Sequence, residues 1–278
     1  MDRKADLHIH TTASDGRLTP QEVVASAIGA GLRTIAITDH DTLAGYLEVS
    51  QTAQTDITII PGIEFSTDLP QNEVHILGYY LDPTHDELQT ILTRIINDRF
   101  DRTRKIIAKL DELGYNISLN RVKEIAGHAQ AIGRPHIAAA LIEKQYFTNV
   151  SQVFNSLLAK NGPAYIPHYK LSPQDVISLI HKAGGLAILA HPGLMNDESL
   201  VQDMIRLGID GIEAIHPAHS EQQVRIYTEW AAKEDLLVTG GSDFHSIPGR
   251  FPERLGEFCI PCCLVEKLHQ RKSAAYST

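Results

Sequence analysis

Five short segments of the chain carry histidine, aspartate or glutamate, the residue types that ligate metal ions and move protons. The segments read HIH, TDH, GIE, AHP and SDFH. With two further residues they supply nine candidate ligands: His8, His10, Asp15, His40, Glu64, His75, His191, Asp243 and His245. Each segment closes a run of apolar residues, so we expect the side chains to meet at one end of a sheet. Because imidazoles and carboxylates without a nearby cysteine suit two or three ions of Zn, Mn or Fe better than Ca or Mg, the pattern indicates a multinuclear metal hydrolase.

Taken alone, each of these residues also has an ordinary structural explanation. His8 and His10 lie two apart on a predicted strand, so they face the same side and can chelate one ion. Asp15 is a common turn residue, Glu64 alone would be a surface residue, and His75 inside an apolar run is as consistent with a hydrogen-bonded core histidine. The joint occurrence of nine such residues near strand ends is what favours a metal centre.

The elements that must position these residues alternate between apolar strand-like runs and amphipathic helices. Thr19 and Glu22 form a capping box with Pro20 at the first helical position, and Gly31 predicts the end of that helix. Such alternation predicts an α/β fold in which parallel strands close, or nearly close, into a barrel, with the ligands at its C-terminal mouth. The seven predicted strands are residues 5–8, 34–38, 57–61, 74–81, 186–190, 211–215 and 236–240.

Between Leu81 and Pro167 the strand pattern stops and helical periods replace it. These periods cover residues 86–113, 120–125, 135–143 and 150–158. We therefore predict a barrel formed by residues 1–81 and 167–278, which carries the metal site. Residues 82–166 would be a helical insertion that folds over the mouth as a lid and supplies substrate-binding side chains.

The amino-acid composition restricts the kinds of molecule that the protein can bind. The 278 residues are 43% hydrophobic, carry a formal charge of −9 and have a pI near 5.8. Binding long nucleic acid requires a basic stripe, so we expect no such partner, while small anions and short oligonucleotides stay open. The chain enters a strand-like run at once and has no apolar stretch of the roughly twenty residues that span a bilayer, which predicts a cytoplasmic protein without a membrane partner.

Candidates for substrate contacts come from the insertion and from the end of the sixth predicted strand. Arg134, within GRPHIA, would clamp a phosphate through its guanidinium, although a surface arginine at a helix start is the alternative. His136 would help to bind substrate. His216 and His219 are placed to bind phosphate or to protonate the leaving oxygen, with structural roles as the alternative. Weaker candidates for anion contacts are His168, Lys160 and Arg250.

The remaining reactive residue types receive no catalytic role. Three cysteines, Cys259, Cys262 and Cys263, lie far from the histidine motifs and form only a weak redox pattern. The remaining histidines, at positions 85, 128, 181 and 269, are interpreted as solvated. Local candidates for stacking on a base are Tyr79, Tyr165 and Tyr169.

The motifs resemble those of the PHP (polymerase and histidinol phosphatase) superfamily, in the same order over nearly the whole chain. The opening DLHIHTTASDG, GRPHIA at residues 133–138 and AGGLAILAHP are most similar to the subfamily that contains RNase AM and the 3',5'-nucleoside bisphosphate phosphatases. The resemblance implies a distorted (β/α)7 barrel of the PHP type with a helical insertion and a trinuclear site. Some relatives similar to histidinol-phosphate phosphatase have histidine in place of Asp15, which argues against their substrate here.

The resemblance also implies how the nine ligands divide among the ions. His8, His10, Glu64 and Asp243 would hold the first ion. Glu64, His75 and His191 would hold the second, and Asp15, His40 and His245 the third. We expect two to three divalent ions, Mn²⁺ first and Zn²⁺ or Fe²⁺ as alternatives.

The implied activity is metal-dependent hydrolysis of a phosphoester, with catalytic roles for His216 and Arg134. The substrate would be the 3'-phosphate of a 3',5'-bisphosphonucleotide, short 5'-phosphorylated RNA degraded from its 5' end, or both, through attack of a metal-bound hydroxide on phosphorus. One alternative is another small-molecule phosphatase, such as a histidinol-phosphate enzyme. The other is a non-catalytic PHP module that binds a partner, against which all nine ligand positions are occupied.

Overall fold

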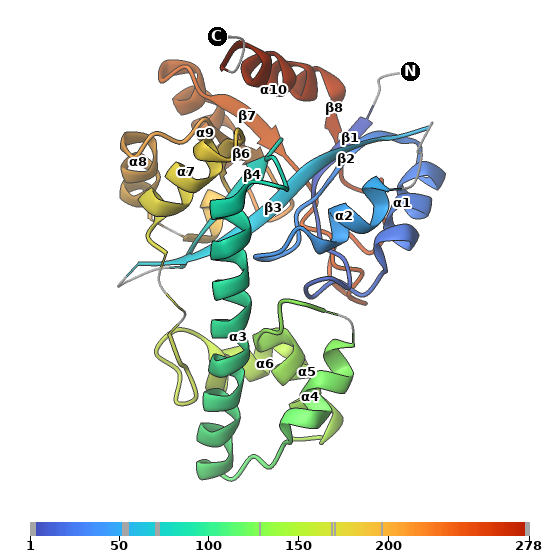
Figure 1. The fold of residues 1–278 in the computed structure, drawn as a ribbon, viewed down its shortest axis with the longest axis vertical. Helices are drawn as coiled ribbons and strands as arrows, with labels where there is room; N and C mark the ends of the chain where they lie inside the picture. The colour runs from blue at the N-terminus through green and yellow to red at the C-terminus, as the bar shows by residue number, and fades with distance from the viewer. Residues whose placement is uncertain are drawn as a thin grey trace.

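One mixed sheet curls into a nearly closed barrel with helices on its outside (Figure 1). The computed structural model describes residues 4–51, 56–69, 73–127, 129–167, 169, 171–195 and 197–275. Over these residues the sheet has eight strands in the order β7-β6-β5-β4-β3-β2-β1-β8. The strands are β1 (Lys4–Ile9), β2 (Leu32–Ile37), β3 (Thr58–Asp68), β4 (Glu73–Tyr79), β5 (Leu186–Leu189), β6 (Gly211–Ile215), β7 (Leu237–Gly240) and β8 (Ile260–Pro261). An isolated parallel bridge between Ile9 and Phe244 brings the segment after β7 back to β1, which nearly closes the barrel.

The predicted α/β barrel is confirmed as a fold class, but the expectation that its strands are all parallel is wrong at β4, and the short strand β8 was not predicted. Strand β4 runs antiparallel to both β3 and β5, and β8 runs antiparallel to β1. The beginning of β4 therefore lies at the same end of the barrel as the ends of β3 and β5. His75, the third residue of β4, thus reaches the mouth, and its carbonyl accepts a 3.1 Å hydrogen bond from the backbone N–H of Ala190.

Strand β3 is longer than predicted, because it continues past the barrel and pairs with β4 as far as Asp68 and Glu73. Glu64 consequently lies inside a strand, whereas the sequence placed it after one. The parallel bridge from His40 to Glu64 joins this part of β3 to the segment after β2. The extension is what carries a carboxylate into the centre of the mouth.

Helices cover the outside of the barrel, and α10 lies at the end that also holds both termini, opposite the insertion (Figure 1). Within the described ranges, no helix combines the length and apolar character needed to cross a bilayer. The covering helices are α1 (Pro20–Gly29), α2 (Ala44–Ser50), α7 (Pro173–Lys182), η2 (Pro192–Met195), α8 (Glu198–Arg206), α9 (Glu221–Lys233) and α10 (Cys262–Ala275).

Between β4 and α7 the chain leaves the barrel as a group of helices built on the long helix α3 (Figure 1). The group comprises α3 (Asp86–Glu112), α4 (Leu119–Ala126), α5 (Arg134–Glu143), α6 (Val150–Val153) and the π-turn η1 (Phe154–Leu158). Leu88 and Leu92 at the start of α3 pack in the apolar layer between the sheet and helices α7, α8 and α9, whereas Ile106 and Leu110 near its end pack in a second apolar cluster with α4 and α5. Helix α3 therefore joins two cores, and the division of the chain at residues 82 and 166 stays a prediction.

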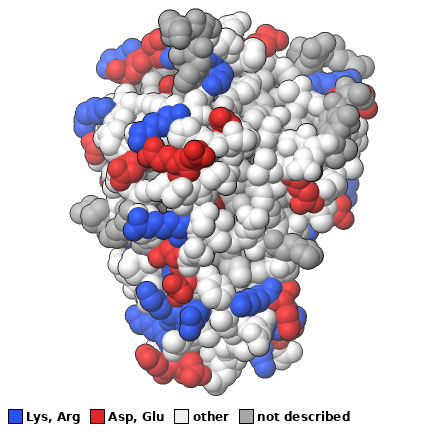
Figure 2. Space-filling model, viewed as in Figure 1, with Lys and Arg blue, Asp and Glu red and all other residues white. Residues whose placement is uncertain are grey.

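The surface over this insertion carries mixed charge. In Figure 2, acidic and basic side chains lie beside one another over the lower part of the molecule. Arg121, for example, pairs with Glu124 at 2.6 Å and with Glu143 at 2.7 Å. This face presents ion pairs rather than the continuous basic stripe that long nucleic acid requires.

The predicted start of α1 is confirmed in detail. Thr19 Oγ1 accepts a hydrogen bond from the Glu22 N–H (3.3 Å), and Glu22 Oε2 accepts one from the Thr19 N–H (2.8 Å). The helix ends at Gly29, and Gly31 has the positive φ of 77° that residues other than glycine rarely adopt.

Replacement of Thr19 by alanine should lower the free energy of unfolding by about 1 kcal/mol, the usual contribution of an N-cap side chain. Urea denaturation followed by circular dichroism would measure it. Gln21→Ala, an exposed change in the same helical turn, is the matched control. Equal stability of the two variants would show that the capping box contributes nothing.

Candidate metal centre

The nine predicted ligands converge at the mouth of the barrel. Their ligand atoms form four overlapping groups, and within each group the atoms lie within 4.8 Å of one another. The groups are His10, Asp15, His40 and His245; His8, His10 and Asp243; His8, Glu64 and His191; and His40, Glu64 and His75. The structure thus brings together residues that lie up to 237 positions apart in the sequence, from His8 to His245. Their roles as ligands stay a prediction.

Glu64 occupies the centre of these groups with only 1% of its side chain exposed. Its Oε1 lies 2.7 Å from His75 Nδ1 and 2.9 Å from His191 Nε2. Its Oε2 lies 3.3 Å from His8 Nε2, 3.2 Å from His10 Nε2 and 3.1 Å from His40 Nδ1. Each oxygen of one carboxylate therefore faces its own set of imidazoles, an arrangement that suits a carboxylate shared by two ions.

Asp15 and Asp243 extend the cluster on the other side of His10. Asp15 Oδ1 lies 3.3 Å from His245 Nε2, and its Oδ2 lies 3.9 Å from His40 Nε2. Asp243 Oδ1 lies 3.3 Å from His10 Nε2 and 3.6 Å from His8 Nε2. These contacts agree with the first and third ligand sets that the resemblance implies.

Several buried polar atoms of the cluster have no hydrogen-bond partner among the described residues. They are His8 Nε2, both ring nitrogens of His10, His40 Nδ1 and Glu64 Oε2. Buried polar groups in folded proteins are nearly always hydrogen-bonded. A set of unsatisfied imidazole nitrogens around a carboxylate oxygen is explained if these atoms bind cations, so the residues fit a multi-metal site.

The ionisation of the cluster supports the same interpretation. Burial raises the pKa of Asp15, Glu64 and Asp243, but the surrounding imidazoles lower it further, to well below the usual range of a carboxyl group. Burial lowers the pKa of His40 to about 3. The three carboxylates therefore stay ionised where little water reaches them, and they require positive charge nearby.

In His8 and His245, the hydrogen bond made by one ring nitrogen determines which nitrogen can bind a metal ion. His8 Nδ1 lies 2.9 Å from Glu213 Oε1, and His245 Nδ1 lies 2.8 Å from the backbone carbonyl of Asp243. Because a carboxylate and a carbonyl are acceptors, these Nδ1 atoms carry protons, and each Nε2 keeps its lone pair for a ligand. Glu213 was not among the predicted site residues, although a charged residue in the middle of the apolar strand GIEAI could have indicated a role at the site.

His216 and His219 differ in what their ring nitrogens can do. His216 Nδ1 accepts the N–H of Ala218 (3.1 Å), so in the neutral ring the proton lies on Nε2, which is 3.8 Å from Asp243 Oδ2. His219 Nδ1 donates to the Ala214 carbonyl (2.9 Å), and its Nε2 accepts the N–H of Gly193 (3.0 Å). His216 therefore presents an Nε2–H hydrogen-bond donor at the mouth, whereas both ring nitrogens of His219 are hydrogen-bonded to the backbone.

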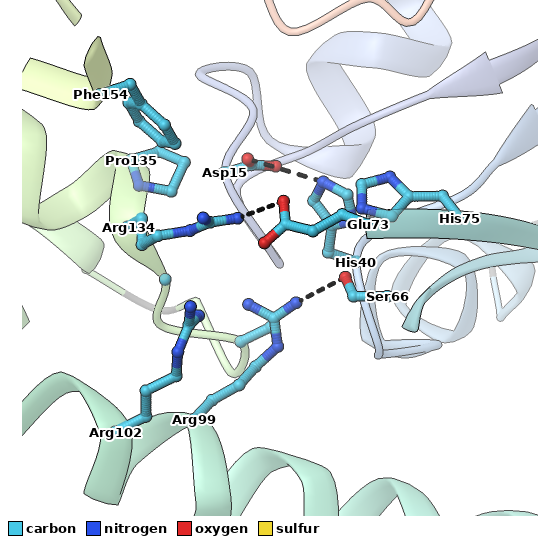
Figure 3. Close-up of a pocket in the computed structure, with 12 residues that line it drawn as sticks. Asp15, His40, Ser66, Glu73, His75, Arg99, Arg102, Arg134, Pro135 and Phe154 are labelled. Carbon is cyan, nitrogen blue, oxygen red and sulfur yellow. Dashed lines mark hydrogen bonds and ion pairs between the residues drawn. The ribbon is translucent and has the colours of Figure 1, made fainter. Parts of the chain in front are cut away.

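A cavity of about 250 Å³ opens beside the metal cluster, and Asp15, His40 and His75 form part of its wall (Figure 3). Arg99 and Arg102 extend toward it from α3, and Arg134 extends from the start of α5 (Figure 3). The other lining residues are Ser66, Glu73, Ala131, Gly133, Pro135 and Phe154. Three guanidinium groups next to a cation site make a pocket for an anion.

Two of these arginines are held by carboxylates. Arg99 Nε donates to Asp41 Oδ2 (2.8 Å), its Nη2 contacts the same oxygen, and Nη2 also donates to Ser66 Oγ (3.1 Å). Arg134 donates to Glu73 Oε2 (2.9 Å) and to the Leu158 carbonyl (3.1 Å). The sequence predicted Arg134 at such a site. Arg99 and Arg102 were not predicted. Both lie on the buried face of α3 among leucine and isoleucine, and this unusual position is the sequence feature that could have indicated them.

The other residues that the sequence suggested as substrate contacts lie in different parts of the structure. His136 is buried, and its Nδ1 accepts the N–H of Gly133 (3.1 Å), which fixes the start of α5. Arg250 pairs with Asp243, and Lys160 donates to the Leu69 carbonyl. The predicted stacking role of Tyr79 is wrong, because this ring is fully buried in the core and its hydroxyl donates to the Leu7 carbonyl. His168 and His128 lie outside the described residues.

The PHP domain model matches residues 6–182, more than half of the 278 residues, and the chain belongs to this family. It is similar over 96% of its length, with 31% identity and a TM-score of 0.86, to 96% of a solved structure from Bifidobacterium adolescentis that is assigned as a metal-dependent phosphoesterase. The fold therefore has a close counterpart among solved structures.

Relatives that match over nearly their full length carry names of phosphoester-cleaving enzymes. A 3',5'-nucleoside bisphosphate phosphatase from Chromobacterium violaceum is 32% identical over 93% of each chain. A 5'-3' exoribonuclease from Haemophilus influenzae is 34% identical over 88% of this chain and 91% of its own. A phosphoribosyl 1,2-cyclic phosphate 1,2-diphosphodiesterase from Eggerthella lenta is 31% identical over 89% of this chain and 96% of its own.

Glu64 should be the ligand whose loss removes the most metal, because its two oxygens face two sets of imidazoles while Asp15 belongs to one group. We expect Glu64→Gln to retain fewer bound ions than Asp15→Asn after Mn²⁺ loading and dialysis, as measured by plasma mass spectrometry. Glu73→Gln, a carboxylate of the adjacent cavity wall, is the control and should retain the wild-type content. Wild-type metal content in Glu64→Gln would contradict a shared carboxylate.

Proposed function

We propose that the protein is a metal-dependent phosphoesterase that hydrolyses the 3'-phosphate of a nucleotide whose 5'-phosphate lies in the arginine cavity. One observation carries this proposal: the candidate metal centre and the arginine-lined cavity share Asp15, His40 and His75 as a common wall. A substrate with two phosphate groups a nucleoside apart would place one group at the metals and the other among the guanidinium groups. The named activities of the relatives from Chromobacterium violaceum and Haemophilus influenzae agree with such a substrate.

The ligand sets would be His8, His10, Glu64 and Asp243; Glu64, His75 and His191; and Asp15, His40 and His245. When bound, divalent cations activate water for attack and neutralise phosphate charge. Mn²⁺ is the ion that we propose first, with Zn²⁺ and Fe²⁺ as alternatives, since all three accept mixed imidazole and carboxylate ligands.

The chain itself would supply binding and a hydrogen bond to the leaving oxygen. Arg134 and Arg99, each already held by a carboxylate, would orient the non-reacting phosphate through their remaining N–H groups. His216 presents its Nε2–H at the mouth, so it would donate a hydrogen bond to the departing 3' oxygen, which would take its proton from solvent. Because both arginines come from residues 82–166, we propose that this insertion forms the substrate-binding part of the site and that the barrel residues hold the metals.

Short 5'-phosphorylated RNA fits the same site. Release of the first nucleotide breaks the bond between phosphorus and the same 3' oxygen, and the first nucleoside again carries a 5'-phosphate. The formal charge of −9 disfavours long nucleic acid. We therefore propose the bisphosphonucleotide as the main substrate and short RNA as a second substrate of the same site.

Mn²⁺-loaded protein should release AMP and phosphate from adenosine 3',5'-bisphosphate, and a chelator should abolish the release. A substrate panel would measure it, with short RNA bearing either a 5'-phosphate or a 5'-hydroxyl, a ribose cyclic phosphate with a second phosphate group, and histidinol phosphate. We expect the 5'-phosphorylated substrates to be preferred, because the ammonium group of histidinol phosphate would be repelled by the arginines. Equal turnover of histidinol phosphate would contradict the proposal and favour a different small-molecule phosphatase.

Arg134→Ala should reduce kcat/KM on adenosine 3',5'-bisphosphate by about 10- to 100-fold, as expected for a lost hydrogen bond to a charged group. The same change should leave 3'-AMP hydrolysis nearly unaltered, because 3'-AMP lacks the 5'-phosphate. Steady-state kinetics on both substrates would measure the difference, with Arg121→Ala, an exposed arginine of the insertion, as the control. An equal loss on both substrates would place Arg134 at the scissile phosphate instead.

A further inference from the structure

One buried carboxylate outside the predicted ligand set touches two of its members. Glu213 lies in the middle of β6 with no exposed side-chain surface. Its Oε1 lies 2.9 Å from His8 Nδ1, and its Oε2 accepts the backbone N–H of His191 at 2.8 Å. One side chain thus holds a residue of β1 and the second residue after β5.

The two contacts act on different properties of the candidate ligands. At His8 the contact decides the tautomer, because an Nδ1–H directed at a carboxylate leaves the lone pair on Nε2. That nitrogen faces Glu64 Oε2 at 3.3 Å. At His191 the contact fixes the backbone, which has a φ of 25°, in a region that residues other than glycine rarely adopt. His191 Nε2 in turn faces the other oxygen of Glu64 at 2.9 Å.

The neighbouring His216 shows that this tautomer is not imposed on every ring at the mouth. His216 Nδ1 accepts the Ala218 N–H, so its proton lies on Nε2. His8 would lose its lone pair on Nε2 if its Nδ1 had a donor in place of Glu213. The carboxylate is therefore what makes His8 a ligand at the atom that faces the cluster.

We infer that Glu213 is a positioning residue that sets the Nε2 donor of His8 and the backbone of His191, and thereby supports the first and second ligand sets together. The inference rests on the proposed metal centre, since it assigns Glu213 a role toward those ions. Hydrogen-bonding partners of this kind orient metal-bound histidines and raise their basicity. Loss of Glu213 should therefore weaken metal binding without removing any ligand.

The chain offers a matched control in Asp210, the residue before β6. Asp210 Oδ2 lies 2.8 Å from His181 Nε2 and accepts the Ala187 N–H at 2.7 Å, so His181 is paired with a carboxylate rather than simply solvated. This carboxylate holds a histidine ring and a strand backbone as Glu213 does, but neither partner belongs to the metal cluster. Asp210→Asn thus reproduces the structural part of the change alone.

The test compares metal-free wild type, Glu213→Gln, Glu213→Ala and Asp210→Asn by calorimetric titration with Mn²⁺ and by thermal denaturation. A glutamine has one acceptor oxygen and can serve His8 or His191 but not both, whereas alanine serves neither. We expect Glu213→Gln to weaken Mn²⁺ binding by about 10- to 100-fold, Glu213→Ala to weaken it at least as much, and Asp210→Asn to bind Mn²⁺ as the wild type does.

A second readout follows the tautomer directly. In Zn²⁺-loaded protein with ¹⁵N-labelled histidine, a protected Nδ1–H signal from His8 should appear in the wild type and in Asp210→Asn and disappear in Glu213→Ala. Mn²⁺ affinity equal to that of the wild type in Glu213→Gln, or a His8 Nδ1–H signal that survives in Glu213→Ala, would overturn the role of Glu213. Failure of the wild type to bind Mn²⁺ would instead contradict the metal centre and the proposed function.

Discussion

A buried carboxylate between five imidazoles is the interaction on which the rest of the structure depends. Glu64 has almost no contact with water, and its two oxygens face His75 and His191 on one side and three further histidines on the other. A charged group removed from water is unstable unless opposite charge compensates it. Asp15 and Asp243 add two more negative charges nearby, and the surrounding carboxylates raise the pKa of His8 and of His10, the latter to about 10, so protonated imidazoles balance the cluster without metal and bound cations would take over that role. The fold must bring five rings to one carboxylate, and it does so through the extension of β3 and the reversed direction of β4.

Three consecutive residues connect this cluster to its surroundings. Asp39 is buried and accepts hydrogen bonds from the Thr11 N–H (2.7 Å) and the Ser14 hydroxyl (2.6 Å), which holds the loop that carries Asp15. His40 faces Glu64, and Asp41 pairs with Arg99 at the arginine cavity. A single turn after β2 therefore sets the loop of one ligand, supplies another and anchors a guanidinium group. Any displacement of this turn would alter the metal centre and the anion pocket together.

The parts of this arrangement that the sequence could predict are those with local signals. The candidate ligands His10, His40, His191 and Asp243 follow apolar strands and His8 lies near the end of one, and this pattern can be recognised from the sequence alone. The antiparallel direction of β4 was not visible, because an apolar run has the same pattern in either direction.

Other elements of the site depend on contacts between distant residues. Arg99 and Arg102 were missed, since a long amphipathic helix predicts a buried face but does not say that the face meets a metal cluster. Glu213 and Tyr79 show the two outcomes for polar groups in apolar strands: the first reaches the mouth, whereas the second is buried in the core. The curvature of the barrel and the register of its strands decide whether such a side chain reaches the mouth or the core. Neither property can be predicted from the sequence of one strand.

The pairing of the arginines explains how a strongly anionic ligand could both bind and leave. Asp41 and Glu73 offset the charges of Arg99 and Arg134, and burial together with the neighbouring Arg134 and Arg99 lowers the pKa of Arg102 to about 9. The paired arginines keep a fixed orientation, so little side-chain freedom is lost when a phosphate binds. Their carboxylate partners also take up the charge again when the phosphate departs. Three unpaired guanidinium groups would bind a 5'-phosphate more tightly but would hold the product as strongly as the substrate, because both carry that group. A cavity whose guanidinium groups are paired with carboxylates instead favours orientation of the substrate over retention of the product.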